Sequence, residues 1–241
     1  MIDPVVLFFL LGATARLLRS DLRVPEPLYD ALSIYLLVAL GLKGGAEMAR
    51  SLAPSLAGQA LLAIAMGCVL PLLAYALLRF LGRFDRSNAA AIAAHYGSVS
   101  VVTFAAGLTY LSTRGIDAEP TMPLFVALLE VPGLLVGVLL ARLGTGRGAS
   151  VGPILRDAFV GRSVILLVGG LATGALLGPG GLAPVMPFFG DLFKGALCLF
   201  MLELGLVAGG QFGALRRAGP FLGAFALLVP PLFGAIGAGF G

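Results

Sequence analysis

Long apolar runs separated by short polar connections are the feature that most constrains this chain. Eight such runs can be placed, at about 4–18, 28–46, 56–80, 87–112, 121–142, 163–178, 187–210 and 218–241. A helix that crosses a bilayer needs about 20 mostly apolar residues, so the runs leave no room for a soluble domain. They do not alternate as the strands of a membrane β-barrel do. The sequence therefore predicts an all-α polytopic membrane protein.

The composition excludes several functional classes. The chain is 59% hydrophobic and 12% charged, whereas soluble domains are roughly 45–50% apolar and about 25% charged. A water-soluble enzyme is therefore excluded, and no nucleic-acid partner is expected because the basic residues lie in short loops. Cys68 and Cys198 lie in apolar runs and are expected to be buried thiols. No zinc-binding spacing is present, so we predict no transition metal and no cofactor.

Arginines are concentrated in the loops that follow the odd-numbered runs, and these loops are predicted to be cytoplasmic. The N-terminus is then outside, and Asp3 in place of a basic leader indicates that the first run is retained as a helix. Residues 151–162 are predicted to form a short amphipathic helix on the cytoplasmic side. The arginines concerned are Arg16, Arg19, Arg23, Arg79, Arg83, Arg86, Arg142, Arg147, Arg156, Arg162, Arg216 and Arg217.

An internal repeat relates the second and seventh runs. Residues 32–45 (LSIYLLVALGLKGG) align without a gap to residues 197–210 (LCLFMLELGLVAGG) at an offset of 165 residues. This offset spans five runs, and an odd number of spans reverses the orientation, which predicts an inverted repeat as in many secondary transporters. Ten spans are then expected, of which this chain holds eight. The predicted domains are a first five-helix repeat at 1–145, a linker at 146–162 and an incomplete second repeat at 163–241.

The fourth run contains a polar interruption, from Gly97 through Ser98, Val99 and Ser100, with Thr103 one turn later. Gly97 is predicted to break the helix near mid-span, and Ser98 is expected to cap the second half. A helix that restarts inside the membrane presents free N–H groups and the positive end of its dipole, which suit a small anion. The alternative is a face of small residues for helix packing.

Two carboxylates lie inside apolar runs. Glu130 precedes Pro132 in the fifth run, and an intramembrane carboxylate indicates a functional site, as a Na⁺ ligand or a proton carrier. A protonated Glu130 bonded to a neighbouring helix remains the alternative. Glu203 in the seventh run supports the same hypothesis less well because its repeat partner is Val38. His95 near Ser98 offers a hydrolase alternative, but no GxSxG motif or orienting acid accompanies it, so we predict no enzyme.

The sequence resembles the sodium-dependent bicarbonate transporter family of cyanobacteria and other bacteria. Three regions carry the resemblance: GLKGGAEMARS (41–51), NAAAIAAHYGSVSVVTFAA (88–106) with LLEVPG (128–133), and FKGALCLFMLELGLVAGG (193–210). The resemblance implies ten spans in two inverted halves, Na⁺-coupled uptake, a homotrimer and the bacterial plasma (inner) membrane. It also implies a PII-like cytoplasmic regulator, although the linker here is short, about 143–162.

For the site, the resemblance implies that bicarbonate binds where two broken helices meet. The first corresponds to Gly97, Ser98, Val99 and Ser100, and the family's acid corresponds to Glu130. The hypothesis is a Na⁺-coupled symporter of a small monovalent anion, bicarbonate, working by alternating access in a lipid bilayer. Na⁺ is assigned to Ser98, Ser100, Thr103 and Glu130. The alternatives are a passive anion channel, a transporter of another small anion or organic acid, and a membrane scaffold. With eight of ten spans, the chain is expected not to transport alone.

Overall fold

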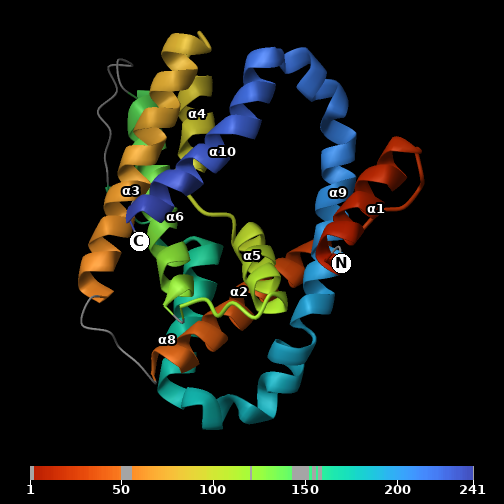
Figure 1. Cartoon of the computed structure of the whole chain (residues 1–241), viewed down its shortest axis with the longest axis vertical. Helices are drawn as coiled ribbons and strands as arrows, with labels where there is room; N and C mark the ends of the chain where they lie inside the picture. The colour runs from red at the N-terminus through yellow and green to blue at the C-terminus, as the bar shows by residue number, and fades with distance from the viewer. Residues whose placement is uncertain are drawn as a thin grey trace. The chain divides into compact units, whose positions relative to one another are not determined.

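Helices make up the architecture of the described residues in the computed structural model, which covers 3–49, 56–119, 121–142, 152–153, 156 and 159–240. Figure 1 shows their arrangement along the chain. In order they are α1 (Pro4–Leu17), α2 (Glu26–Met48), α3 (Leu56–Ala76), η1 (Leu77–Leu81), α4 (Arg86–Tyr96), α5 (Val101–Thr113), α6 (Met122–Arg142), α8 (Arg162–Leu182), η2 (Ala183–Val185), η3 (Pro187–Asp191), α9 (Phe193–Ala218) and α10 (Pro220–Phe240).

Six helices in the described part of the chain are long and apolar enough to cross a membrane: 26–48, 56–81, 122–142, 162–185, 193–214 and 220–239. The helix α1 is apolar but shorter. The predicted all-α membrane class is therefore confirmed. Part of the amphipathic helix predicted at 151–162 lies outside the described residues, and so does most of the predicted linker.

Two predicted runs differ in detail from the helices. The run predicted from residue 187 begins as the short η3, and α9 starts only at Phe193. The run predicted to end at residue 178 continues to Leu182, but Gly178 interrupts it with φ 61° and ψ −179°. A positive φ is inexpensive only for glycine, and the following Pro179 has no N–H for a helical bond, so the helix kinks there.

The described helices group into two compact units. Unit 1 comprises residues 1–52, 100–124 and 166–217, and unit 2 comprises residues 53–99, 125–165 and 218–241. Each unit draws helices from both sides of residue 146. Compact units and sequence repeats divide a chain in different ways, so the repeat boundaries at 1–145 and 163–241 stay a prediction.

In unit 1, α1 packs closely on α9 through glycines. A Cβ on Gly12 would overlap the carbonyl oxygen of Leu202 and lie 2.9 Å from the nitrogen of Leu206. A Cβ on Gly205 would overlap the carbonyl oxygen of Phe9. Small residues permit this backbone approach between apolar helices. Contacting residue numbers rise together along the two helices, so α1 and α9 run parallel.

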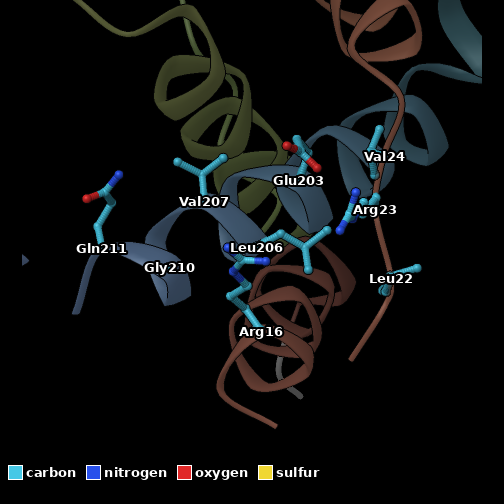
Figure 2. A pocket seen from close by; sticks show the side chains of 9 residues that line it. All are labelled: Arg16, Leu22, Arg23, Val24, Glu203, Leu206, Val207, Gly210 and Gln211. Carbon is cyan, nitrogen blue, oxygen red and sulfur yellow. The ribbon is translucent and has the colours of Figure 1, made fainter. Parts of the chain in front are cut away.

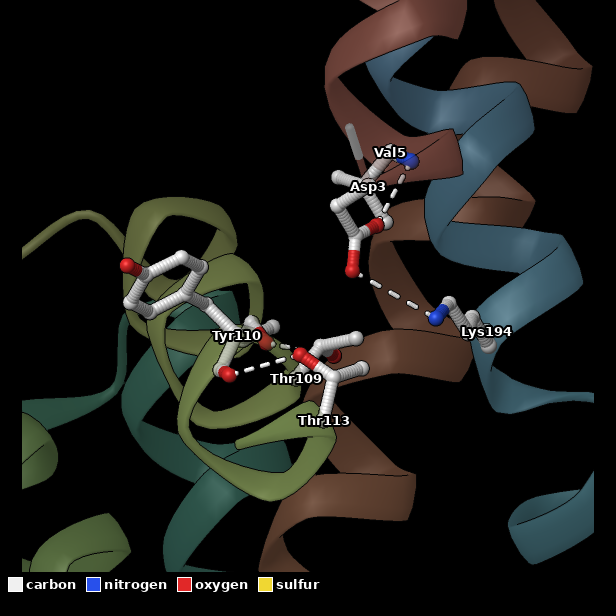
Figure 3. A network of polar contacts seen from close by, with 7 residues as sticks. Asp3, Val5, Thr109, Tyr110, Thr113 and Lys194 are labelled. Atoms are coloured by element: carbon white, nitrogen blue, oxygen red, sulfur yellow. Dashed lines mark hydrogen bonds and ion pairs between the residues drawn. The ribbon is translucent and has the colours of Figure 1, made fainter. Parts of the chain in front are cut away.

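The N-terminal ends of α1 and α9 also meet, which agrees with the parallel direction. The carboxylate of Asp3 accepts a bond from the Val5 N–H at 2.9 Å and so caps α1. The same carboxylate pairs with the Lys194 ammonium at 3.4 Å (Figure 3). One aspartate thus begins α1 and links it to the first turn of α9.

A second parallel pair in unit 1 consists of α2 and α8. A Cβ on Gly41 would lie 2.6 Å from the carbonyl oxygen of Leu167, and one on Gly45 would overlap that of Leu171. From the other side, a Cβ on Gly174 would overlap the carbonyl oxygen of Leu42. Here too the contacting numbers rise together. The glycine pair that marks the sequence repeat thus contributes to a helix contact at Gly45.

Unit 2 is built on an aromatic and alanine core from α3, η1, α4 and α10. Small side chains on α4 let the phenylalanines of α10 approach its backbone. Tyr96 packs against two of these rings, with centroids 5.0 Å from Phe225 and 6.1 Å from Phe233. The buried residues of this cluster are Ala74, Leu78, Ala89, Ala93, Phe225, Val229 and Phe233. This packing fixes α4 up to Tyr96, the last residue before the polar interruption.

Candidate functional site

The fourth apolar run is broken where the sequence predicts. The helix α4 ends at Tyr96, α5 begins at Val101, and residues 97–100 are not helical. Figure 1 shows this link as a thin connection between α4 and α5. The predicted discontinuous helix is therefore present. The chain also passes from unit 2 to unit 1 here, between Val99 and Ser100.

The residue that caps α5 differs from the prediction. Ser100, not Ser98, is the N-cap: its Oγ accepts a bond from the Thr103 N–H at 3.3 Å, and its φ and ψ are −68° and 115°. Its carbonyl accepts the first helical bond, from the Phe104 N–H at 2.9 Å. Both serines suit a cap chemically, so sequence preference does not choose between them.

The interruption leaves several backbone donors without backbone acceptors. Among the described residues, no carbonyl accepts a bond from the N–H of Ser98, Val99 or Ser100. The first N–H groups of α5, at Val101 and Val102, have no acceptor within the helix, because no helical carbonyl precedes them by four residues. N–H groups without a backbone acceptor thus extend from Ser98 into the first turn of α5, and their assignment to an anion stays a prediction. Ser98 and Val99 are half-buried, whereas Ser100 is exposed.

Close backbone contacts hold the first residue of the interruption. A Cβ on Gly97 would overlap Cγ of Pro71 in α3, and would lie 2.8 Å from Cα of Gly133 and 2.9 Å from the carbonyl oxygen of Gly67. All these residues are buried. Gly133 in turn approaches the break, because its Cβ would lie 2.9 Å from the Ser98 nitrogen. We call Gly67, Pro71, Gly97, Pro132 and Gly133 the glycine–proline node.

A comparison with known families identifies the chain at this point. The family model of the Na⁺-dependent bicarbonate transporter superfamily matches residues 4–241, which is nearly all of the sequence. The chain belongs to this superfamily. No curated protein matches it significantly. Membrane transport of bicarbonate that depends on Na⁺ is therefore the activity of the family, which is one of transporters.

The glycine–proline node is the feature around the interruption that the sequence analysis did not predict. Its members come from α3, α6 and the first residue after α4, which are separated along the chain, so no single motif contains them. The sequence did contain a signal for this cluster, because Pro71 and Pro132 both lie within apolar helices. Apolar segments that glycine or proline interrupts are a pointer to transporter binding sites. Only the fold shows that Pro71 contacts Gly97 and that Pro132 contacts Gly67.

The predicted sodium ligands are only partly placed. Ser100 Oγ accepts the Thr103 N–H and keeps a lone pair, while Thr103 itself is exposed. The backbone of Glu130 lies in α6, three residues before Gly133, but its side chain lies outside what the structure describes. The assignment of Na⁺ to Ser98, Ser100, Thr103 and Glu130 stays a prediction.

The other polar residues singled out by sequence lie elsewhere in the units. His95 is exposed on α4. Glu203 lies on α9 beside a cavity that Arg16 and Arg23 also line (Figure 2). Among the described residues, no group of three His, Cys, Asp or Glu side chains is placed to hold a metal ion.

Proposed function

We propose that this member of the superfamily is a Na⁺-coupled symporter that carries bicarbonate by alternating access. The observation that supports it most is the interruption at 97–100, where a helix restarts between buried contacts with its donors free of backbone partners. The family membership supplies the substrate class and the ion on which transport depends. The site, the coupling and the mechanism are the proposal.

Bicarbonate suits such donors on physical grounds. It is a small planar anion with three oxygens, and backbone N–H groups at a helix start hold an anion by hydrogen bonds and by the helix dipole. Residues 97–100 carry no charged side chain. A site without a fixed positive charge releases the anion more easily than one built on arginine, which suits a carrier that must unload its substrate. We assign the anion to Gly97, Ser98, Val99 and Ser100.

Sodium provides the compensating charge in this proposal. An isolated ion moved into a dry, apolar medium loses tens of kcal/mol of solvation, so carrying an anion and a cation together lowers the barrier. Hydroxyl and carboxylate oxygens from Ser98, Ser100, Thr103 and Glu130 are suitable Na⁺ ligands. Pairing the ions gives a physical reason for coupled transport.

The packing of unit 1 supports the proposed inverted repeat. The second helix of the predicted first half, α2, packs on α8, which is the first helix of the second half. Reciprocally α9, the second helix of the second half, packs on α1. A two-fold axis that relates the two halves would exchange these two helix pairs, so the presence of both contacts is what such an axis requires. Inverted repeats of this kind underlie alternating access in many transporters.

The same directions support counting α4 and α5 as one crossing. Because successive spans alternate in direction, two spans run parallel when an odd number of crossings lies between them. The parallel pair α2 and α8 meets this condition only if α4 and α5 together cross once, given that α3 and α6 each cross. The chain then has eight spans, with an external N-terminus by the arginine distribution. The inner membrane, the homotrimer and the PII-like regulator belong to this proposal through the family resemblance.

The test is uptake of radiolabelled bicarbonate by the full-length protein in cells without other bicarbonate uptake. We expect accumulation against a gradient that disappears when choline replaces Na⁺. Uptake that ignores this replacement contradicts the symporter. A passive channel equilibrates bicarbonate without accumulating it, and a carrier of another anion accumulates a labelled organic acid but no labelled bicarbonate.

A further inference from the structure

A cavity lies in unit 1 at the C-terminal end of α1, remote in sequence from the interruption. Its volume is about 470 Å³, and it is bounded by α1, the link to α2 and α9 (Figure 2). Its polar lining comes from Arg16, Arg23, Glu203 and Gln211. An adjoining cavity of about 600 Å³ shares Arg16 and Arg23 and adds Arg19. Volumes of this order fit a small ligand or a head group.

The paired glycines of α9 make room for an arginine here. A Cβ on Gly209 would lie 2.9 Å from Cβ of Arg16. A Cβ on Gly210 would lie 3.2 Å from Nε of Arg16. The guanidinium group of Arg16 therefore lies along the α9 backbone at the cavity wall, as Figure 2 shows. Its position is set by packing, which reduces the entropy lost when it binds a ligand.

Arg19 reaches the adjoining cavity from a strained backbone. Arg19 follows the end of α1 and lies in the left-handed region with φ 58°, where glycine is usual. The Ser20 N–H donates a hydrogen bond to the Ala15 carbonyl at 2.9 Å. A side chain in this conformation costs about 1 kcal/mol relative to glycine. Arg83 shares this feature, with φ 56°, but it lines neither of these two cavities.

The charges around the cavities leave an excess of positive charge. Three guanidinium groups, from Arg16, Arg19 and Arg23, face two carboxylates, from Asp21 and Glu203. Across the described ranges, no ion pair within 4 Å joins any of these groups. The arginines therefore keep their N–H donors for a ligand, and guanidinium groups bind phosphate oxygens in pairs of parallel bonds.

Apolar side chains flank the basic group. Leu18 is 77% exposed at the end of α1, and Val207 is 51% exposed on the cavity wall. Leu22 lines the cavity and is 39% exposed. A soluble phosphate gains nothing from such surface, whereas acyl chains bury it. Basic pockets between membrane helices on the cytoplasmic side suit anionic head groups.

We propose that these two adjoining cavities together bind the phosphate group of an anionic phospholipid, with Arg16, Arg19 and Arg23 as its ligands. The Glu203 carboxylate repels the negatively charged phosphate, which keeps the binding weak enough for lipid molecules to exchange. The site is independent of bicarbonate transport, since none of its residues belongs to the interruption at 97–100.

The test measures binding of fluorescent phosphatidylglycerol and of zwitterionic phosphatidylcholine to the purified chain in detergent micelles. We expect a preference for phosphatidylglycerol that falls roughly fivefold with Arg16→Gln and again with Arg19→Gly, because each arginine near an anionic head group contributes about 1 kcal/mol. Arg19→Gly also relieves backbone strain, so weaker binding by this variant is not a folding defect. Glu203→Gln should strengthen the preference for phosphatidylglycerol.

Arg83→Gly is the matched control, with the same strain relief and loss of charge as Arg19→Gly, and it should leave the preference for phosphatidylglycerol unchanged.

Each contrary outcome overturns the assignment. Equal losses from Arg83→Gly and Arg19→Gly mean that binding follows overall charge rather than this cavity. If millimolar inorganic phosphate displaces phosphatidylglycerol and binds in an Arg16-dependent manner, the ligand is a soluble phosphate. No preference over phosphatidylcholine means that the cavity holds no anionic lipid. None of these results bears on Na⁺-dependent bicarbonate uptake.

Discussion

Gly97 and Pro71 approach so closely that a methyl group on Gly97 would overlap the proline Cγ. This contact joins the end of α4 to a proline inside α3, both within unit 2. Proline has no N–H to donate, so the α3 backbone near Pro71 is locally free of one helical bond. The break after α4 thus contacts α3 at the residue where α3 lacks a helical hydrogen bond.

Gly97→Ala is the direct test of this contact. We expect the free energy of unfolding to fall by about 1–3 kcal/mol, the usual effect of overpacking, because Gly133 Cα and the Gly67 carbonyl are backbone atoms that cannot rotate away. Thermal unfolding in detergent micelles measures it. Gly107→Ala is the control, since its Cβ meets nothing within 4 Å. If both variants unfold alike, the node does not constrain the break.

Replacing Ser100 separates its capping role from its proposed binding role. Ser100→Ala removes the cap and should lower stability by about 1 kcal/mol. Ser100→Asp keeps an N-cap oxygen, so we expect near-normal thermal unfolding but loss of bicarbonate uptake by the full-length protein, because a carboxylate repels the anion. Ser98→Ala should leave the cap intact. Normal uptake by Ser100→Asp would place the anion elsewhere.

The start of α4 predicts a pH dependence. Hydrogen bonds from the Asn88 backbone N–H and side-chain amide hold the pKa of Asp85 below its ordinary value. A lowered pKa in the folded state means that Asp85 stabilises the protein above its unfolded pKa, and that this contribution disappears as the pH falls through the folded value. The Tm difference between the natural protein and Asp85→Ala should therefore shrink on acidification. With Asp85→Asn, which caps without titrating, acid should affect stability less than in the natural protein; an equal acid response in both rules out the carboxylate as the cause.

The parallel contact between α1 and α9 can be tested at Gly205. Gly205→Ala places a methyl group against the carbonyl oxygen of Phe9, so we expect a loss of about 1–3 kcal/mol by overpacking. Gly213→Ala on the same helix meets nothing within 4 Å and should be neutral or slightly stabilising. Comparable melting temperatures for the two variants would contradict the α1–α9 packing.

The sequence predicted the class of fold and the position of the break because both depend on local chemistry. Apolar runs of sufficient length specify spans, and a glycine followed by serines specifies an interruption. The capping residue was assigned wrongly, since Ser98 and Ser100 have equal capping chemistry and only the backbone decides between them.

The contacts around the break needed the fold itself. Gly67, Pro71 and Gly133 come from separated helices, and apolar periodicity does not say which helices become neighbours. The left-handed Arg19 was also unforeseen, because arginine gives no signal of a positive φ. The prediction for Glu130 concerns a side chain outside the described structure.

The reciprocal packing in unit 1 has a consequence for biosynthesis. The first residues of α1 meet their partner only when Lys194 has been made, 191 residues later. The glycine face of α2 lacks its partner until α8 has been made, and that of α1 lacks its partner until α9 has been made. Folding of this unit therefore follows the completion of α9 by the ribosome, and a nascent chain stalled between α8 and α9 carries α1 without its proper neighbour.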